Sequence, residues 1–419
     1  MSAPLPKGWT LATLSDLISS GGLFTDGDWV ESKDQDPAGK VRLIQLADVG
    51  DGAFRNRSSR FLRPDQAERL GCTFLQEGDV LVARMPDPLG RACIYPGSKL
   101  PAVTAVDVCI IRPSNDEIDN RWLMWFLNAP QFRREVSARQ TGTTRKRISR
   151  SNLAALPLPV PTFAEQNHIV AAIEELLSRL DAAEVALWSA EHRIGALEKS
   201  IITEASSTLT PPQHWKITTV ADAGTVGLGL QRSPKRHNGP NMRPYLRVAN
   251  VFEDRIDDSD VMSMDIADAE WERYLLQDGD VLLNEGQSPE FLGRPAIYRG
   301  EPANVAFTNS VIRFRANAGI DPEWALLVFR SHLHNRRFMR ESQITTNIAH
   351  LSAGRFKTVE FPVPPLDEQH ARVADARFRL DGCARLRAEV AAGRRRSTVL
   401  RRSVLSAAFS GKLIPQDQD

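Results

Sequence analysis

The sequence has little cysteine, no long apolar run and no leader-like start. Its four cysteines, Cys72, Cys93, Cys109 and Cys383, include no CxxC pair and no spacing suited to zinc, which favours buried thiols in a reducing compartment over a disulfide framework. No apolar run approaches the ~20 residues that a membrane helix needs. The N-terminus lacks the charged-then-apolar form of a signal peptide. We therefore expect a soluble cytoplasmic protein.

The chain also has almost no net charge. Lys and Arg number 53 and Asp and Glu number 52, which gives +1, so a nucleic-acid surface would have to come from local clustering. Hydrophobic residues make up 42% and charged residues 25%, as in ordinary globular proteins. At roughly 100–200 residues per domain, the 419 residues predict two to four domains.

Common catalytic motifs are missing. There is no GxxxxGK(S/T) phosphate loop, no HExxH, no GxSxG and no Asn-Pro-Pro-aromatic tetrapeptide. Glu31 and Lys33 have the spacing of a nuclease E-x-K pair, but no well-placed Pro-Asp precedes them. His332 and His334 lie in an Arg-rich helical stretch, which favours a solvated or phosphate-facing position over metal binding. We predict no catalytic residue and no metal ligand.

What the sequence does contain is a repeat with a period near 200 residues. The matches are too many and too well ordered for a coincidence of common turn tripeptides. They pair residues 6–9 with 212–215, 44–49 with 246–251, 74–81 with 275–282, 89–91 with 292–294, and 159–166 with 362–369. The period is too long for a solenoid unit, so we interpret each copy as a domain followed by a connector.

Each copy begins with a domain of mixed α and β structure. Short apolar stretches such as 80–83, 108–111 and 311–312 are bounded by Gly, Pro, Asp and Asn, as strands are, while 122–132 and 324–338 have helical spacing. Prolines within 157–161 and 362–365 predict extended joints. The predicted domains are 1–157 and 211–361, and the predicted helical segments are 158–210 and 362–419.

Both connectors have the heptad pattern of a coiled coil. From Ile169 to Ile201, apolar or small residues alternate at steps of four and three over more than four heptads, whereas the pattern from Val373 to Ala407 skips a step locally. The positions predicted to form the helix-pair seam are Ile173, Leu176, Leu180, Leu187, Ile194, Leu197, Leu386, Val390, Leu400 and Val404.

Opposite charge indicates how the two helices relate. Residues 162–207 contain eight acids and three bases, a net −5, whereas 367–414 contain eleven bases and five acids, a net +6. Each helix leaves one domain and must reach the other, so we predict that the two pair antiparallel. The alternative is that the Arg runs 394–396 and 401–402 contact nucleic-acid phosphate.

Two equivalent loops differ between the copies while their flanks match. Residues 84–91 follow one Gly-Asp-Val-Leu strand and 284–294 follow its repeat, and the offset between the copies rises from 201 to 203 residues across these loops. Variable hydrogen-bonding residues on a fixed scaffold suit base recognition, although for any single residue an ordinary polar turn is the alternative. The candidates for base readout are Arg84, Asp87, Arg91, Asn284, Glu285, Gln287, Ser288 and Arg294.

A second pair of clusters, 141–147 and 345–347, suits contacts with the DNA backbone. Hydroxyl residues, backbone amides and bases together favour phosphate contacts, which set affinity without reading sequence. A solvated surface is again the alternative. The candidates are Thr143, Thr144, Arg145, Lys146, Arg147, Arg336, Arg337, Thr345, Thr346 and Asn347.

In this order, the blocks resemble the specificity (S) subunit of type I restriction-modification systems. The resemblance rests on the opening Leu-Pro-Lys-Gly-Trp of residues 5–9, the repeated Gly-Asp-Val-Leu and Leu-Gly-Arg blocks, the Pro-Val-Pro…Glu-Gln segments and residues 407–413. It implies an α+β fold with two repeated target-recognition domains, separated by two long antiparallel coiled-coil helices and pseudo-two-fold symmetric. The first copy departs from the pattern, because residues 204–209 lack the Ala-Phe-Ser-Gly-Lys-Leu of the second.

The resemblance also implies a function. Such a subunit reads a bipartite, asymmetric sequence in double-stranded DNA and scaffolds methyltransferase (M) subunits, expected to be two per chain. Restriction (R) subunits can join them. S-adenosylmethionine is expected on the M subunits, with no cofactor bound by this chain and no catalysis by it. Two alternatives remain open: a free-standing metal-dependent nuclease using Glu31 and Lys33, and a protein-interaction scaffold that does not bind DNA.

Overall fold

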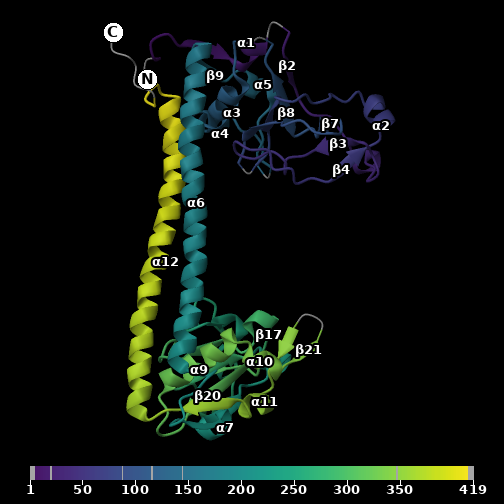
Figure 1. Ribbon diagram of the computed structural model, residues 1–419. Coiled ribbons are helices and arrows are strands. Elements are labelled where there is room, and N and C mark those ends of the chain that lie inside the picture. Colours follow the sequence, from purple (N-terminus) through teal and green to yellow (C-terminus); the bar gives the residue numbers. More distant parts are fainter. Residues whose placement is uncertain are drawn as a thin grey trace. The chain divides into compact units, whose positions relative to one another are not determined.

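The computed structural model describes residues 5–18, 21–86, 88–114, 117–143, 145–345 and 348–413. It divides into two compact units, Met1–Leu187 with Ala392–Asp419 (unit 1) and Trp188–Ala391 (unit 2). Each unit holds one domain of the repeat and part of each long helix (Figure 1). The predicted segments 158–210 and 362–419 each contain a whole helix, whereas the compact units divide both helices.

The domain of unit 1 is built on a four-stranded antiparallel sheet. Its order is β2 (Leu23–Thr25), β8 (Val108–Arg112), β5 (Val80–Ala83) and β6 (Ala92–Ile94). Val80 and Val82 face a core that includes α3 (Asn120–Asn128) and α4 (Pro130–Ala138), while Leu81 and Ala83 face a second core on the other side. The sheet is therefore covered on both faces, which explains why β5 and β8 are continuous apolar runs.

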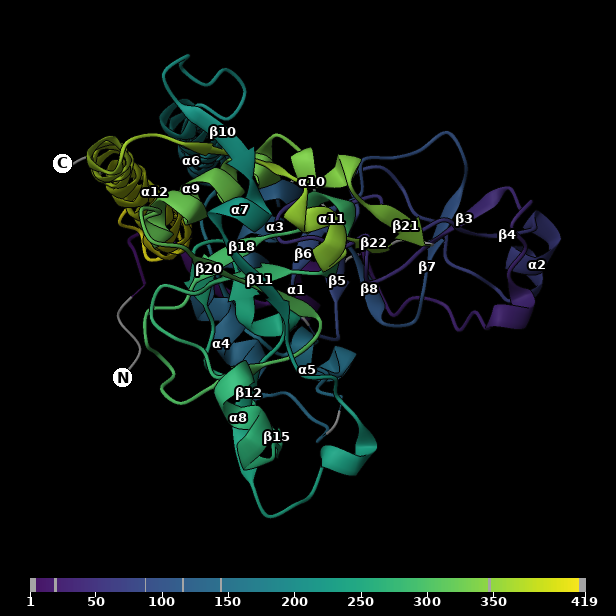
Figure 2. The same cartoon turned by 90° about the horizontal axis from the view of Figure 1, so that it is seen from below.

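A smaller sheet forms a projecting lobe in unit 1 (Figures 1 and 2). It consists of β4 (Arg60–Leu62), β3 (Val41–Ile44) and β7 (Ala102–Thr104), and α2 (Pro64–Arg69) packs its Ala67 into the lobe core. The short elements α1 (Leu14–Ile18), η1 (Ser32–Asp34) and α5 (Arg150–Ala154) complete the domain.

Unit 2 repeats this topology. Its main sheet has the order β11 (Gly224–Leu228), β20 (Val311–Ala316), β16 (Val281–Asn284) and β18 (Pro295–Ile297), and its lobe sheet is β15 (Met262–Asp265), β12 (Met242–Leu246) and β19 (Ala306–Phe307), with α8 (Asp268–Tyr274) (Figure 2). The shared strand order confirms that the sequence repeat corresponds to two copies of one domain. The remaining elements are α7 (Val220–Ala223), η2 (Pro234–Arg236), η3 (Val248–Asn250), β13 (Val251–Phe252), β14 (Arg255–Ile256), β17 (Gly286–Gln287), η4 (Pro289–Phe291), α9 (Pro322–His334), α10 (Arg337–Arg340), β21 (Gln343–Thr345), β22 (Ile348–His350) and α11 (Ala353–Lys357).

The proline-rich joints are extended strands, as predicted. β9 (Pro157–Val160) pairs antiparallel with β1 (Thr10–Thr13), and β23 (Glu360–Val363) pairs in the same way with β10 (Lys216–Thr219). Each joint leads directly into a long helix. These are α6 (Phe163–Ser206) and α12 (Leu366–Ala408). Within the described residues, neither these nor any other helix is long and apolar enough to cross a bilayer.

The long helices pair antiparallel in each unit, which confirms the prediction from charge. In unit 1, Arg401 of α12 forms an ion pair with Asp181 of α6. In unit 2, Arg387 lies 2.9 Å from Glu191 and 3.0 Å from Glu198, and Arg379 lies 2.9 Å from Glu204. Residue numbers rise along one helix as they fall along the other. Because these pairs are exposed, they set register and orientation more than they stabilise.

The predicted seam is only partly correct. Ile173, Ile194 and Val390 are buried, and Leu176, Leu180, Leu187 and Val404 are half-buried, but Leu197, Leu386 and Leu400 are 45%, 53% and 50% exposed. On α12, the buried positions include members of the same heptad pattern at a strict spacing of seven, namely Ala376, Cys383, Val390 and Ser397. Gly393 meets Leu187 so closely that a Cβ there would lie 3.0 Å from its Cδ2. Choosing the larger side chains from the sequence shifts the predicted contact face around the helix.

Candidate nucleic-acid interface

Two arginines anchor the variable loop of unit 1, residues 84–91 (loop A). Arg91 is buried and donates from Nε to the Val49 carbonyl (2.7 Å) and from Nη2 to the Leu46 carbonyl (2.8 Å). Arg84 donates from Nη2 to the Val106 carbonyl (2.8 Å). Both side chains hold loop A in place, and their base-reading role stays a prediction.

Loop B, residues 284–294 of unit 2, has the same kind of anchor. Asn284 is fully buried, and its Nδ2 donates to the Val251 carbonyl at 3.2 Å. Arg294 donates from Nη2 to the same carbonyl at 2.7 Å, with its guanidinium 4.6 Å from the centre of the Phe252 ring. Asn284 and Arg294 thus hold loop B through these contacts, and their base readout stays a prediction.

Loop B and the second cluster belong to one small sheet. β17, at the tip of loop B, pairs with β22, and β22 pairs with β21. The backbone carbonyl of Glu285 accepts a hydrogen bond from the Leu351 amide (2.8 Å), and its carboxylate lies 3.3 Å from Nδ1 of His350. Gln287 and Ser288 are half-buried near the tip. The candidates Asp87, Thr144, Thr346 and Asn347 lie outside the described residues, and Thr345 is in β21.

The basic candidates for backbone contact separate into two kinds. Thr143, Arg145, Lys146, Arg147 and Arg336 are exposed. By contrast, Arg337 is half-buried and lies 2.6 Å from Glu360 and 2.8 Å from Glu341. Two carboxylates thus pair with its guanidinium in this structure, and its contact with the DNA backbone stays a prediction.

The two histidines of the Arg-rich stretch are structural rather than solvated or phosphate-facing. His332 is buried with its Nε2 3.0 Å from the Glu360 carbonyl, and burial lowers the pKa of His332 to about 4. His334 lies 2.8 Å from Oε1 of Glu253. The sequence prediction fails here because helical spacing alone does not show which face of α9 is covered.

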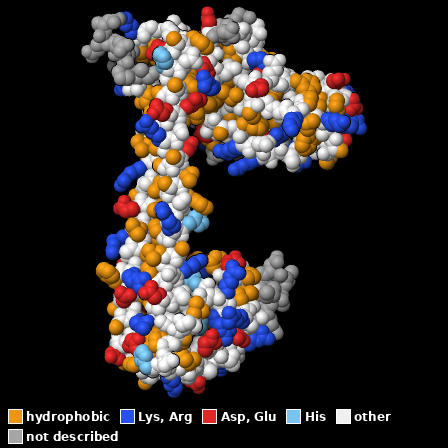
Figure 3. Space-filling model, viewed as in Figure 1, with side chains coloured by type: hydrophobic (Ala, Val, Ile, Leu, Met, Phe, Trp, Pro, Cys, Tyr) orange, Lys and Arg blue, Asp and Glu red, His pale blue; other side chains and the backbone are white. Residues whose placement is uncertain are grey.

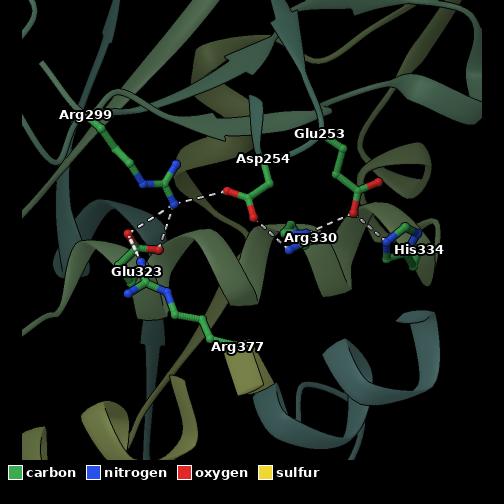
Figure 4. Close-up of polar contacts among 7 residues, drawn as sticks. All are labelled: Glu253, Asp254, Arg299, Glu323, Arg330, His334 and Arg377. Carbon is green, nitrogen blue, oxygen red and sulfur yellow. Dashed lines mark hydrogen bonds and ion pairs between the residues drawn. The ribbon is translucent and has the colours of Figure 1, made fainter. Parts of the chain in front are cut away.

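A network of ion pairs connects the support of loop B to α12 in unit 2 (Figure 4). Glu253 and Asp254 follow the Val251 carbonyl that holds the loop, and both pair with Arg330 of α9, at 2.9 and 3.1 Å. Burial opposes ionisation of Glu253, but His334 and Arg330 outweigh it and lower the pKa of Glu253 to about 2.

The same network continues to the helix. Arg299 bridges Asp254 and Glu323, at 3.2 Å from each, and Glu323 also pairs with Arg377 of α12. These groups line a cleft of about 850 Å³ within unit 2. In unit 1, the equivalent ion pair joins Arg121 of α3 and Glu174 of α6 at 3.6 Å. Here the helix carries the acid and the domain the base, the reverse of Glu323 and Arg377 in unit 2.

A clamp at each helix start was missed from the sequence. Gln166 is buried, donates from Nε2 to the Glu117 and Pro161 carbonyls, and accepts from the Asp119 amide. Gln369 makes the same three bonds, to Gly319, Pro364 and Asp321. The Glu-Gln pair that repeats in both copies is the signal for this clamp. It ties each domain to the helix that follows it.

The fold and the candidate interface define a class of protein: two copies of one domain, each clamped to the long helix that follows it and each presenting an anchored loop of different sequence. Residues 6–186 match the family model described as the type I restriction modification DNA specificity domain. The second domain, which has the same strand order, lies beyond the matched residues.

Similar proteins point the same way. The type I restriction enzyme EcoKI specificity subunit of Escherichia coli K12 is 23% identical over 319 residues, 73% of this chain and 68% of that subunit. The putative MjaX specificity subunit of Methanocaldococcus jannaschii is 25% identical over 166 residues, 38% of this chain and 37% of that protein.

Two solved structures share the fold. A chain from a study of complex assembly and conformational transition of the type I R-M system has a TM-score of 0.74 at 16% identity, covering 98% of this chain and 100% of its own. The HsdS subunit of Thermoanaerobacter tengcongensis has a TM-score of 0.58 at 16% identity, covering 98% of each. Residues 6–186 thus match the DNA specificity domain of type I restriction-modification systems, and over most of its length the chain is similar to specificity subunits of these systems.

Proposed function

We propose that this chain reads a bipartite, asymmetric sequence in duplex DNA, one half with each domain. The observation that carries the proposal is the pair of loops A and B. Arg91 and Arg294 fasten them to equivalent carbonyls, of Val49 and Val251, while the loop interiors differ in sequence. Recognition of two different base sequences requires loops of different sequence on the same backbone support.

The long helices support docking of methyltransferase (M) subunits. Both units expose large apolar side chains on these helices, which a free surface seldom does without a partner (Figure 3). They are Val399 and Leu400 in unit 1, and Trp188, Leu197, Phe378 and Leu386 in unit 2. We infer one M subunit for each unit, each carrying its own S-adenosylmethionine, with restriction (R) subunits joining the assembled complex. The proposal includes a cytoplasmic location for this complex.

The test is to express the chain with its M partner and map the modified bases in cellular DNA. We expect two short, different sequences separated by a fixed spacer of unspecified bases. A single continuous sequence or a palindrome would contradict the proposal. Exchanging residues 84–91 for those of a differently specific relative should change one half of the target, and exchanging 284–294 should change the other.

The proposal also differs from the nuclease alternative in a measurable way. Lys33 lies 2.6 Å from Glu31 on an exposed surface, so each neutralises the other. Among the described residues, no three His, Cys, Asp or Glu side chains are grouped to hold a metal ion. The purified chain with Mg²⁺ or Mn²⁺ should leave duplex DNA intact; cleavage that is lost in Glu31→Gln would favour the nuclease.

A further inference from the structure

We propose that Trp29 of unit 1 and Gln231 of unit 2 contact bases of the target, so that each domain reads DNA with a second loop. The inference rests on the proposed function, in which the chain binds duplex DNA. The two loops are residues 26–31 (loop C) and 228–233 (loop D).

Loops C and D have the same backbone frame. Asp28 forms a parallel bridge with Ala105, and Leu230 forms one with Thr308. The glycine before each bridge is required by close approach. A Cβ on Gly27 would lie 2.1 Å from the Ala105 carbonyl oxygen, and one on Gly229 would lie 2.2 Å from the Phe307 carbonyl oxygen. Trp29 and Gln231 therefore occupy equivalent positions.

Trp29 is exposed on a fixed mount. Its side chain is 70% exposed, although its neighbours are anchored. The Asp28 carboxylate accepts from the Thr73 amide at 3.1 and 3.2 Å, and Val30 packs against the lobe core. In unit 2 the exposed Gln231 likewise follows Leu230, which is buried in the lobe core. The anchored neighbours leave each exposed side chain with little backbone freedom to lose on binding.

Loop C adjoins loop A through a shared turn. The Asp26 carboxylate lies 3.3 Å from Nε of Arg84, and the Arg84 amide donates to the Asp107 carbonyl at 2.9 Å. In unit 2, the Asn309 amide donates to the Leu230 carbonyl (3.1 Å) and the Glu285 amide to the Ser310 carbonyl (3.0 Å). In both domains, the segment with the exposed residue and the variable loop thus contact the same turn.

The chemistry of the two positions fits different bases. An exposed indole gains nothing for folding, but it presents a large flat face on which a base or a thymine methyl can pack. The indole N–H reaches Glu31 only at 3.4 Å, so it is readily redirected to an acceptor on DNA. A glutamine amide instead matches adenine with two hydrogen bonds. The same frame with Trp in one copy and Gln in the other gives two half-sites different contacts.

The experiment measures binding of the chain with its M partner to the mapped duplex and to a shuffled duplex. Trp29→Ala should weaken specific binding about 10-fold and relax one base position in the half-site of unit 1, while leaving the other half unchanged. Gln231→Ala should relax one position in the half-site of unit 2. Trp29→Phe should retain most of the affinity. Leu11→Ala, at an equally exposed apolar residue (65%), should change neither affinity nor motif.

Other outcomes are equally decisive. If Trp29→Ala leaves the motif unchanged and the affinity within twofold of the wild type, the inference is overturned. Equal weakening of binding to the specific and the shuffled duplex would also overturn it, because such a contact reads no base. If Trp29→Ala lowers the melting temperature, the variant Trp29→Gln is measured in its place. The expected result is then a shifted base preference at that one position. A wild-type complex that selects no sequence would refute the proposed function itself.

Discussion

At the scale of residues, several side chains that repeat in both copies hold the structure. Asp79 and Asp280 of the Gly-Asp-Val-Leu blocks are buried, and each forms an ion pair at 2.6 Å, with Arg112 and Arg315 respectively. Trp29 and Gln231 are exposed and do not match. A match between the copies therefore points to residues with a structural role, as it does for these two aspartates.

His332 predicts a dependence of stability on pH. Burial lowers its pKa to about 4 from the usual 6.5, so the folded state binds fewer protons than the unfolded state and loses stability as pH falls from about 6.5 towards 4. Between pH 7 and 4.5, the free energy of unfolding measured with denaturant should fall by about 2–3 kcal/mol more in the wild type than in His332→Leu. Equal losses in both proteins would rule out this role.

The exposed cluster Arg145, Lys146 and Arg147 predicts affinity without selectivity. Replacing all three with Ala should weaken binding to every sequence alike and reduce the slope of log K against log salt by about 2–3, through loss of phosphate contacts. Arg337→Ala is the control, because Arg337 is held by Glu341 and Glu360; it should lower stability and leave the salt slope unchanged. A changed base preference in the triple variant would contradict the assignment.

At the scale of elements, register decides which residues of a helix face inward. The heptad period of the long helices is correct from the sequence, but the contact face is offset where small residues, such as Cys383 and Ser397, occupy it. A period is a local property. The face depends on which side chains let two helices approach closely, and Gly393 opposite Leu187 shows this directly.

This register predicts different outcomes for two similar substitutions. Leu180→Asp should destabilise unit 1 by roughly 3 kcal/mol, since Leu180 packs against its core and a buried carboxylate would lack a partner. Leu400→Asp, on the exposed face of α12, should cost less than about 0.5 kcal/mol. Thermal unfolding of both variants distinguishes the two positions; similar losses would mean that the seam is misassigned.

At the scale of the whole molecule, both long helices contribute residues to both units, so their length bears on how far apart the half-sites lie. Deleting one heptad at facing positions of α6 and α12 should change the spacer or abolish specific binding, and leave each half-sequence as it was. Modified-base mapping reads both outcomes. An unchanged spacer would show that the helices do not set it.

Deletion of a heptad from α6 alone is the matched control. It moves Glu191 and Glu198 out of reach of Arg387 and misaligns the seam. We expect this variant to lose stability rather than acquire a new spacer, and its melting temperature tests the difference.

The sequence by itself determined the repeat, the two helices, their opposite charge and the extended joints, because each depends on residues close together in the chain or on a simple period. Tertiary structure decided which polar residues remain free. Arg91 is bound by carbonyls of residues 46 and 49, and Arg337 by Glu360, partners that lie far away in the sequence. Arg145 and Trp29 have no such covering and stay exposed. The sequence of a loop shows which side chains are present. Only the folded chain shows which of them are bound by groups from distant parts of the sequence and which remain exposed and able to contact DNA.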